Sequence, residues 1–184
     1  IDDIDIKHIQ LDCLRKNIAL IQQEVFLFSD SILNNITLFD PSIDREKVVV
    51  AAKQIGVHDF ISSLPNKYNY IVGERGVTLS SGQRQLIAFL RVYVRDPKIL
   101  ILDEATSSID TATEELLQNA LARLSQDRTT IIIAHRLSTI INADKILHLQ
   151  DGSVIEEGTH EELMENSKGY FSMYCLQTEN VLNT

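Results

Sequence analysis

Four short apolar runs, each bounded by polar or turn residues, predict strands in this chain. They are IALI (18–21), ILIL (99–102), TTIIIA (129–134) and KILHL (145–149). Continuous apolar runs of this length are typical of strands buried on both faces, as in a parallel sheet. We therefore expect these segments to form a mostly parallel sheet.

Helical patterns fill the stretches between the runs. Apolar residues recur at helical spacing over 44–55, 83–94 and 111–124. The first pattern ends at Gly56, the second ends before Pro97, and Asp110 is placed to cap the start of the third. The alternation of strands and helices predicts an α/β layer architecture.

Two stretches depart from this alternation. Residues 30–80 are helical in pattern with few strand signals, and they predict a separate lobe. Near the end, Thr159 and Glu162 are spaced as a capping box, in which each side chain satisfies a backbone donor of the other. This box predicts a short terminal helix.

Composition limits the class of protein. A chain of 184 residues with 44% hydrophobic content can bury a core of one compact domain. The net charge of −9 and the scattered Lys and Arg argue against nucleic acid as a partner. Cys13 and Cys175 are too few for a disulfide framework and fit a reducing, cytosolic setting. No apolar run approaches the ~18 residues of a membrane span, so a membrane connection would have to come through a partner or a further segment.

The first candidate for chemistry is the carboxylate pair Asp103 and Glu104, which follows the run ILIL. Burial of each aliphatic side chain contributes roughly 1.5–3 kcal/mol, whereas a bare buried carboxylate would cost several kcal/mol. We therefore expect the strand to end where Asp103 begins, at the carboxyl edge of the sheet where ligands bind. Two acids there suit a divalent cation and a water. The alternative is that the pair only ends a strand and solvates a turn.

The second candidate is LSSGQ (79–83), just before an apolar helical pattern. Ser80, Ser81 and Gly82 would present free backbone N–H groups and the positive end of a helix dipole to an anion. The alternative is a plain serine N-cap, which accounts for Ser80 but not for the Gly-Gln that follows.

Six motifs in order give the chain a family resemblance. They are Gln23 in IALIQQEVFLF, VGERG (72–76), LSSGQ (79–83), ILILDE (99–104), SSID (107–110) and His135 in AHRLST. The chain resembles the nucleotide-binding domain of ABC transporters of the exporter type, in which these motifs correspond to the Q-loop, an exporter-type loop, the signature, Walker B, the D-loop and the switch histidine. The resemblance implies a P-loop NTPase (RecA-like) core with a mostly parallel sheet, formed by 1–29 and 96–184, and a helical subdomain at about 30–95.

The resemblance also implies roles at the nucleotide. Asp103 is expected to hold Mg²⁺ through water, and Glu104 to polarise the attacking water as general base. Gln23 is expected to ligate Mg²⁺ through its amide oxygen, with Gln22 as the rival residue. His135 is expected to contact the γ-phosphate of ATP. Outside this resemblance, a lone Gln is an ordinary surface residue and a histidine at the end of a strand is commonly structural.

Two motifs point to a second protomer. In the family, the signature loop, here Ser80 to Gln83, grips the γ-phosphate held by the opposite protomer of a head-to-tail dimer. Ser81 stands where glycine is commoner. Asp110 and Ser107 of the D-loop are expected to communicate across that dimer, and an N-cap role for Asp110 is equally compatible. For the neighbouring Arg75 and Arg84 we expect only a solvated surface role.

One motif of the family is absent from these residues. A phosphate-binding loop needs GxxxxGK[ST], and no Gly-Lys pair occurs among the 184 residues. The family places this loop and an adenine-stacking aromatic residue before the position of Ile1, so the chain is expected to be an N-terminally truncated domain. We expect the missing strand to leave backbone groups unpaired beside 99–102, to favour self-association, and to leave weak ATP binding.

The implied function is the ATP-binding and ATP-hydrolysing part of an ABC exporter on the cytoplasmic side of a membrane. Its partners would be a second nucleotide-binding domain and the transmembrane domain, and its cofactors ATP and Mg²⁺. A chromosome or DNA-repair ATPase of the same family would carry a long insertion, but Gln23 and Ser80 lie only 57 positions apart. A non-catalytic regulatory module derived from such an ATPase stays open, as does the transported substrate.

Overall fold

The protein is represented by a computed structural model, which describes residues 1–103, 110–134, 139–166 and 168–182. The described residues form two compact units, 1–133 and 134–184. None of the helices in this part of the chain combines the length and the apolar character needed to cross a membrane.

A parallel three-stranded sheet lies at the centre of the first unit, in the order β1-β2-β3. The strands are β1 (Ile18–Ile21), β2 (Ile99–Asp103) and β3 (Thr129–Ile133). The prediction of a parallel sheet within an α/β fold is confirmed. The expectation of unpaired backbone groups beside 99–102 is wrong, because β2 is hydrogen-bonded to a strand on each side.

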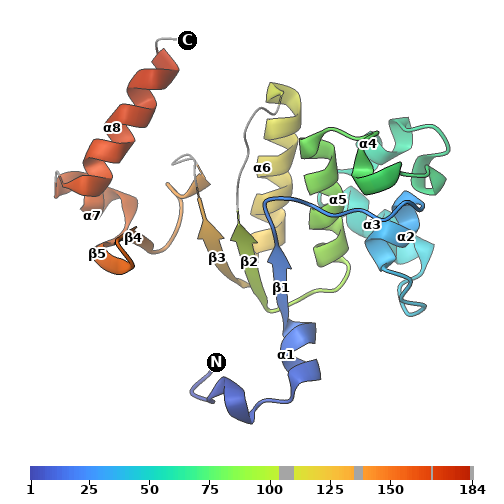
Figure 1. Cartoon of the computed structure of the whole chain (residues 1–184), viewed down its shortest axis with the longest axis horizontal. Helices are drawn as coiled ribbons and strands as arrows, with labels where there is room; N and C mark the ends of the chain where they lie inside the picture. Colours follow the sequence, from blue (N-terminus) through green and yellow to red (C-terminus); the bar gives the residue numbers. More distant parts are fainter. Residues whose placement is uncertain (104–109, 135–138, 167, 183–184) are drawn as a thin grey trace. The chain divides into compact units, whose positions relative to one another are not determined.

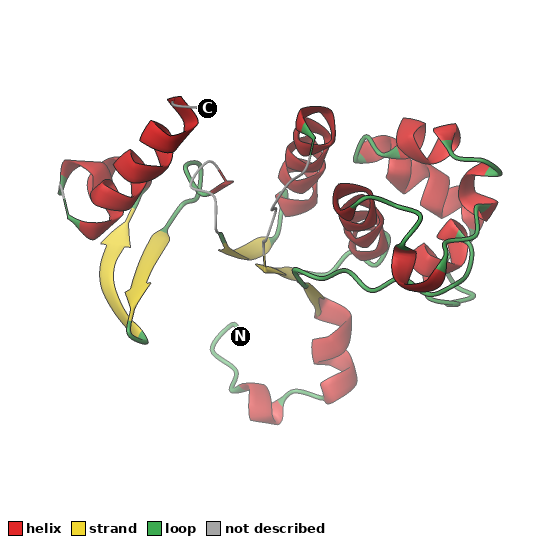
Figure 2. Cartoon of the chain, turned by 45° about the horizontal axis from the view of Figure 1, so that its top comes forward, coloured by secondary structure: helices red, strands yellow, loops and turns green. Residues whose placement is uncertain are grey.

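The two faces of this sheet differ in burial. Leu100 and Leu102 are buried in the core cluster that also contains residues of α5 (Ser81–Tyr93) and α6 (Thr111–Ser125). Figure 2 shows both helices on one side of the sheet. On the opposite face, Leu20, Ile131 and Ile133 are 55%, 52% and 54% exposed. The expectation that these strands are buried on both faces is therefore wrong for the described residues.

The lobe between β1 and α5 is helical, as the sequence predicts. Its helices are α2 (Ile32–Thr37), α3 (Arg45–Gln54) and α4 (His58–Ser63), with single 3-10 turns η2 (Lys67–Asn69) and η3 (Glu74–Gly76). Figure 1 shows these helices grouped beside α5, against which α2 and α3 pack. A subdomain boundary near residues 30 and 95 stays a prediction. At the N-terminus, η1 (Ile6–His8) and α1 (Leu11–Asn17) precede β1.

The second unit is built on a hairpin. The strands β4 (Ile146–Gln150) and β5 (Ser153–Gly158) pair antiparallel. The turn residues Asp151 and Gly152 both have positive φ, 49° and 77°, as a two-residue Asp-Gly hairpin turn requires. The apolar run 145–149 therefore pairs within a hairpin, and its assignment to the parallel sheet is wrong.

Two helices follow the hairpin. Thr159 and Glu162 form the expected capping box at the start of α7 (His160–Glu165). After it comes α8 (Gly169–Leu182), which the sequence analysis did not predict. Tyr170 of α8, Leu163 of α7 and Ile146 of β4 form a small core of their own.

Candidate nucleotide site

The carboxyl edge of the sheet brings two of the predicted residues together. Ile21, the last residue of β1, is paired with Leu102, so Gln23 and Asp103 both lie just beyond this pair. Asp103 is half-buried as the final residue of β2, one position further into the strand than expected, and Gln23 is exposed. The sheet register therefore places a carboxylate and an amide at the same edge of adjacent strands.

The rival residue Gln22 has different surroundings. It lines a small cavity of 110 Å³ between β1 and α5, together with Glu24, Phe26 and Arg91. Gln23 stays the predicted Q-loop residue. Glu104, Ser107 and His135 lie outside the described residues, and their roles stay predictions.

The start of α5 is a complete capping box. Ser80 Oγ accepts the backbone N–H of Gln83 at 3.2 Å, and Gln83 Oε1 accepts the backbone N–H of Ser80 at 3.0 Å. The plain N-cap interpretation of Ser80 is thus confirmed, and it explains Gln83 as well. Ser81 and Gly82 occupy the first turn, where backbone N–H groups have no intrahelical acceptor. These two groups are the ones left for an anion, and that role stays a prediction.

Arg84 is not the solvated surface residue that the sequence suggested. Its Nη1 donates to the carbonyl of Leu79 at 2.8 Å and reaches the carbonyl of Gly76 at 3.5 Å. Gly76 has φ +78°, and an added Cβ there would lie 2.7 Å from Arg84 Cδ. Arg84 therefore fixes the loop that leads into the signature segment.

Asp110 caps helix α6, as one of its two interpretations requires. Its Oδ1 accepts the backbone N–H of Thr113 at 2.9 Å. This hydrogen bond, with further bonds from the first turn of the helix, holds the pKa of the Asp110 carboxyl below its ordinary value. A role for Asp110 across a dimer stays a prediction.

A magnesium ion fits the residues at the sheet edge by donor chemistry. Mg²⁺ is typically held by one or two protein oxygens, with water and substrate phosphates completing the octahedron. Asp103 and Gln23 offer one carboxylate and one amide oxygen at the same edge. In the described part of the chain, no group of three or more His, Cys, Asp or Glu residues forms a metal cage. A site of this kind would therefore depend on phosphate oxygens for the rest of its ligands.

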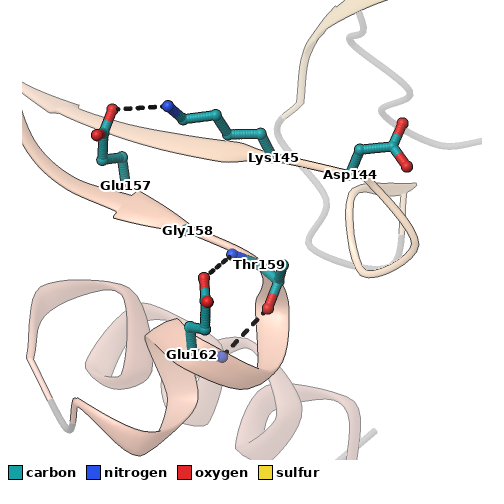
Figure 3. A pocket seen from close by; sticks show the side chains of 6 residues that line it. All are labelled: Asp144, Lys145, Glu157, Gly158, Thr159 and Glu162. Atoms are coloured by element: carbon teal, nitrogen blue, oxygen red, sulfur yellow. Dashed lines mark hydrogen bonds and ion pairs between the residues drawn. The ribbon is translucent and has the colours of Figure 1, made fainter.

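A second cavity, of 280 Å³, lies in the unit 134–184 and contains none of the predicted site residues. Figure 3 shows the ion pair between Lys145 Nζ and Glu157 at 3.0 Å and the capping box of Thr159 and Glu162. The side chain of Asp144 points away from both carboxylates. Two of the three acidic side chains are thus engaged in structural contacts.

Comparison with known proteins agrees with this geometry. The family model described as ABC transporter matches residues 1–107. The chain is 49% identical over 177 residues to a Staphylococcus aureus protein named as a multidrug export ATP-binding/permease protein, covering 96% of this chain and 31% of that protein. The chain belongs to the ABC transporter family.

Two further relatives are exporters or multidrug resistance proteins by name. The multidrug resistance protein pgp-1 of Caenorhabditis elegans is 49% identical over 178 residues, which cover 97% of this chain and 14% of that protein. The fold is similar to that of a bacterial Atm1-family ABC exporter solved with ATP bound, with a TM-score of 0.86 at 41% identity over 96% of this chain and 31% of the other. The chain thus spans about a third of the length of the bacterial relatives it matches.

Proposed function

We propose that this chain is the part of an ABC exporter that binds ATP with Mg²⁺ and hydrolyses it to power transport across a membrane. One observation carries the proposal: adjacent parallel strands end at Ile21 and Asp103 on the same edge of the sheet, and Gln23 follows just beyond Ile21, in a chain of the ABC transporter family. In support, the Staphylococcus aureus relative is named as a multidrug export ATP-binding/permease protein.

Each of the predicted residues would have a distinct task at the nucleotide. Asp103 and Gln23 would hold Mg²⁺, which when bound neutralises charge on the phosphates. Glu104 accepts a proton from the attacking water as general base, an effect worth a factor of ~10²–10⁴. His135 orients that water and the γ-phosphate.

The remaining residues act across a dimer. Ser81 and Gly82 donate free backbone N–H groups at the positive end of α5, where an anion is stabilised by the helix dipole. In a head-to-tail pair, this helix start would face the phosphate held by the partner, and Asp110 would lie at the same interface. A transmembrane domain would complete the exporter, and the pair would sit at its cytoplasmic surface.

The test uses the longer protein that the proposal implies, an exporter of which this chain would be a part. Glu104→Gln should leave MgATP binding intact and lower turnover by about 10²-fold or more, because the amide cannot accept the proton. Glu46→Gln, at an exposed position in the first turn of α3, is the matched control and should keep turnover. Wild-type turnover in Glu104→Gln would remove Glu104 from its role. A longer protein that never hydrolyses MgATP would favour a non-catalytic module instead.

A further inference from the structure

The segment 22–30 connects β1 to α2 and carries Gln23, yet it contains no helix or strand. Backbone groups of Phe26 and Phe28 are instead held by side chains from two helices. Asn35 of α2 bonds both backbone groups of Phe28, and Arg91 of α5 donates from Nη2 to the carbonyl of Phe26 at 3.2 Å. The position of this connector is therefore set from outside itself.

Arg91 joins three elements at one guanidinium. Besides Phe26 it reaches α2, because its Nε donates to the carbonyl of Asn35 at 2.8 Å. Figure 1 shows the connector passing α5 on its way from β1 to α2. The side chain thus ties the connector and α2 to α5, the helix that begins at Ser81.

The electrostatics of Arg91 are unusual for a residue with only a packing role. Burial, and then the neighbouring Arg95, lower the pKa of Arg91 to about 10. Among the described residues, no carboxylate forms an ion pair with it. Taking a cation partly out of water costs free energy, and no ion pair in the described part of the chain offsets that cost for Arg91. What an apolar residue cannot supply is a rigid planar fork that holds two carbonyls at fixed positions.

We propose that Arg91 is a positioning residue, which locks the connector carrying Gln23 to helix α5 carrying Ser81 and Gly82. The inference rests on the proposed function, because it links the magnesium side of the site to the signature side. Arg91 lies about 15 Å along the helix from Ser81, at 1.5 Å per residue, and does not itself reach the phosphate end. Arg91 would act by holding the connector and α5 rigidly together, so that a displacement of the connector also moves α5.

The chain offers a matched control in Arg95. Its Nη2 donates to the carbonyl of Thr37 at 2.7 Å and its Nη1 to the carbonyl of Ile36 at 3.1 Å. Arg95, two residues after the end of α5, therefore bonds the end of α2 as Arg91 does, but within the described residues it forms no hydrogen bond with the connector.

The experiment compares Arg91→Lys with Arg95→Lys in the longer protein, with unfolding temperature, KM for MgATP and kcat as readouts. Lysine keeps the positive charge but lacks the planar guanidinium that donates to two carbonyls at once. Arg91→Lys should lower kcat about tenfold or more with little change in KM, because misplacement by about 1 Å can cost up to ~10²-fold. Arg95→Lys should keep kcat within about twofold even where it lowers the unfolding temperature equally. Equal effects on kcat, or wild-type kcat in Arg91→Lys, would overturn the inference.

A second measurement needs no variant. A non-hydrolysable MgATP analogue should raise amide-exchange protection in 24–31 and in 81–84 over the same concentration range in the wild-type protein. Protection of one segment without the other would contradict the coupling.

If wild-type protein turns over and Glu104→Gln does not, while Arg91→Lys keeps full kcat, only this inference fails. If Glu104→Gln turns over at the wild-type rate, the assignment of Glu104 within the proposed function fails.

Discussion

Asn35 and Phe28 pair as two residues of neighbouring strands would, although neither is in a strand. The backbone N–H of Phe28 donates to Asn35 Oδ1 at 2.8 Å, and Asn35 Nδ2 donates back to the carbonyl of Phe28 at 3.0 Å. Asn35 is fully buried, at 0% exposure. A single amide side chain thus bonds both backbone groups of Phe28 in the connector that follows β1.

Asn35→Ala should therefore destabilise the chain by about 1–3 kcal/mol, because the backbone N–H of Phe28 loses its acceptor and the carbonyl of Phe28 keeps only the N–H of Asp30 as a donor. The free energy of unfolding by denaturant measures the loss, and amide exchange at Phe28 should accelerate. Asn34→Ala is the control: it removes one bond to the partly exposed Asp30 and should cost about 1 kcal/mol or less. Equal losses of unfolding free energy in the two variants would contradict this role of Asn35.

Substitutions at Ser80 can separate its role as the N-cap of α5 from its predicted role near a phosphate. Aspartate is as good an N-cap as serine, whereas Ser80→Ala should cost about 1 kcal/mol of stability. If the helix start faces a phosphate, Ser80→Asp should keep the unfolding temperature of the longer protein and yet lower its ATP turnover by charge repulsion. Unfolding temperature and turnover, measured side by side, check this. Full turnover in Ser80→Asp would leave Ser80 with the capping role alone.

The docking of α8 onto the hairpin should weaken in acid. The side chain of Glu156 is 7% exposed, its Oε2 lies 2.7 Å from His148 Nδ1, and the same oxygen accepts the backbone N–H of Tyr170 at 2.9 Å. The contact with His148, with help from Tyr170 and Lys168, lowers the pKa of the Glu156 carboxyl.

A lowered folded pKa means that ionised Glu156 stabilises the fold above the ordinary glutamate pKa of about 4.3, and that this contribution disappears as pH falls through the folded value. The protection factor of the Tyr170 amide should therefore drop below that pH. Glu156→Gln keeps an oxygen acceptor that cannot titrate, so its protection should show no such step. A step at the same pH in both proteins would mean that another group titrates.

The 184-residue chain by itself should bind MgATP weakly, with a Kd of about 1 mM or above. The reason is the absence of a Gly-Lys phosphate loop from its sequence, which leaves Asp103 and Gln23 without a cradle for the β- and γ-phosphates. Isothermal titration of the chain, with the longer protein as control, measures this affinity. Micromolar affinity for the isolated chain would show that these residues hold the nucleotide unaided.

Much of the first unit follows from the sequence because its signals are local. The apolar runs at 18–21 and 99–102, the cap at Asp110 and the capping box at Ser80 each depend on residues within a few positions. The family resemblance implies that Gln23 and Asp103 hold the same magnesium ion, and the parallel register places both at the same edge of the sheet. Motif order then pointed to the family that the comparisons confirm.

The rest was decided by contacts between distant parts of the chain. Hydrophobicity alone does not tell which partner a strand takes, so only the structure places β4 in a hairpin and leaves one face of the parallel sheet exposed. Nor does the sequence show that Arg91 reaches carbonyls 56 and 65 positions away. Helix caps and apolar runs are set by near neighbours, but the partners of a backbone group in an irregular segment depend on how the chain folds back on itself.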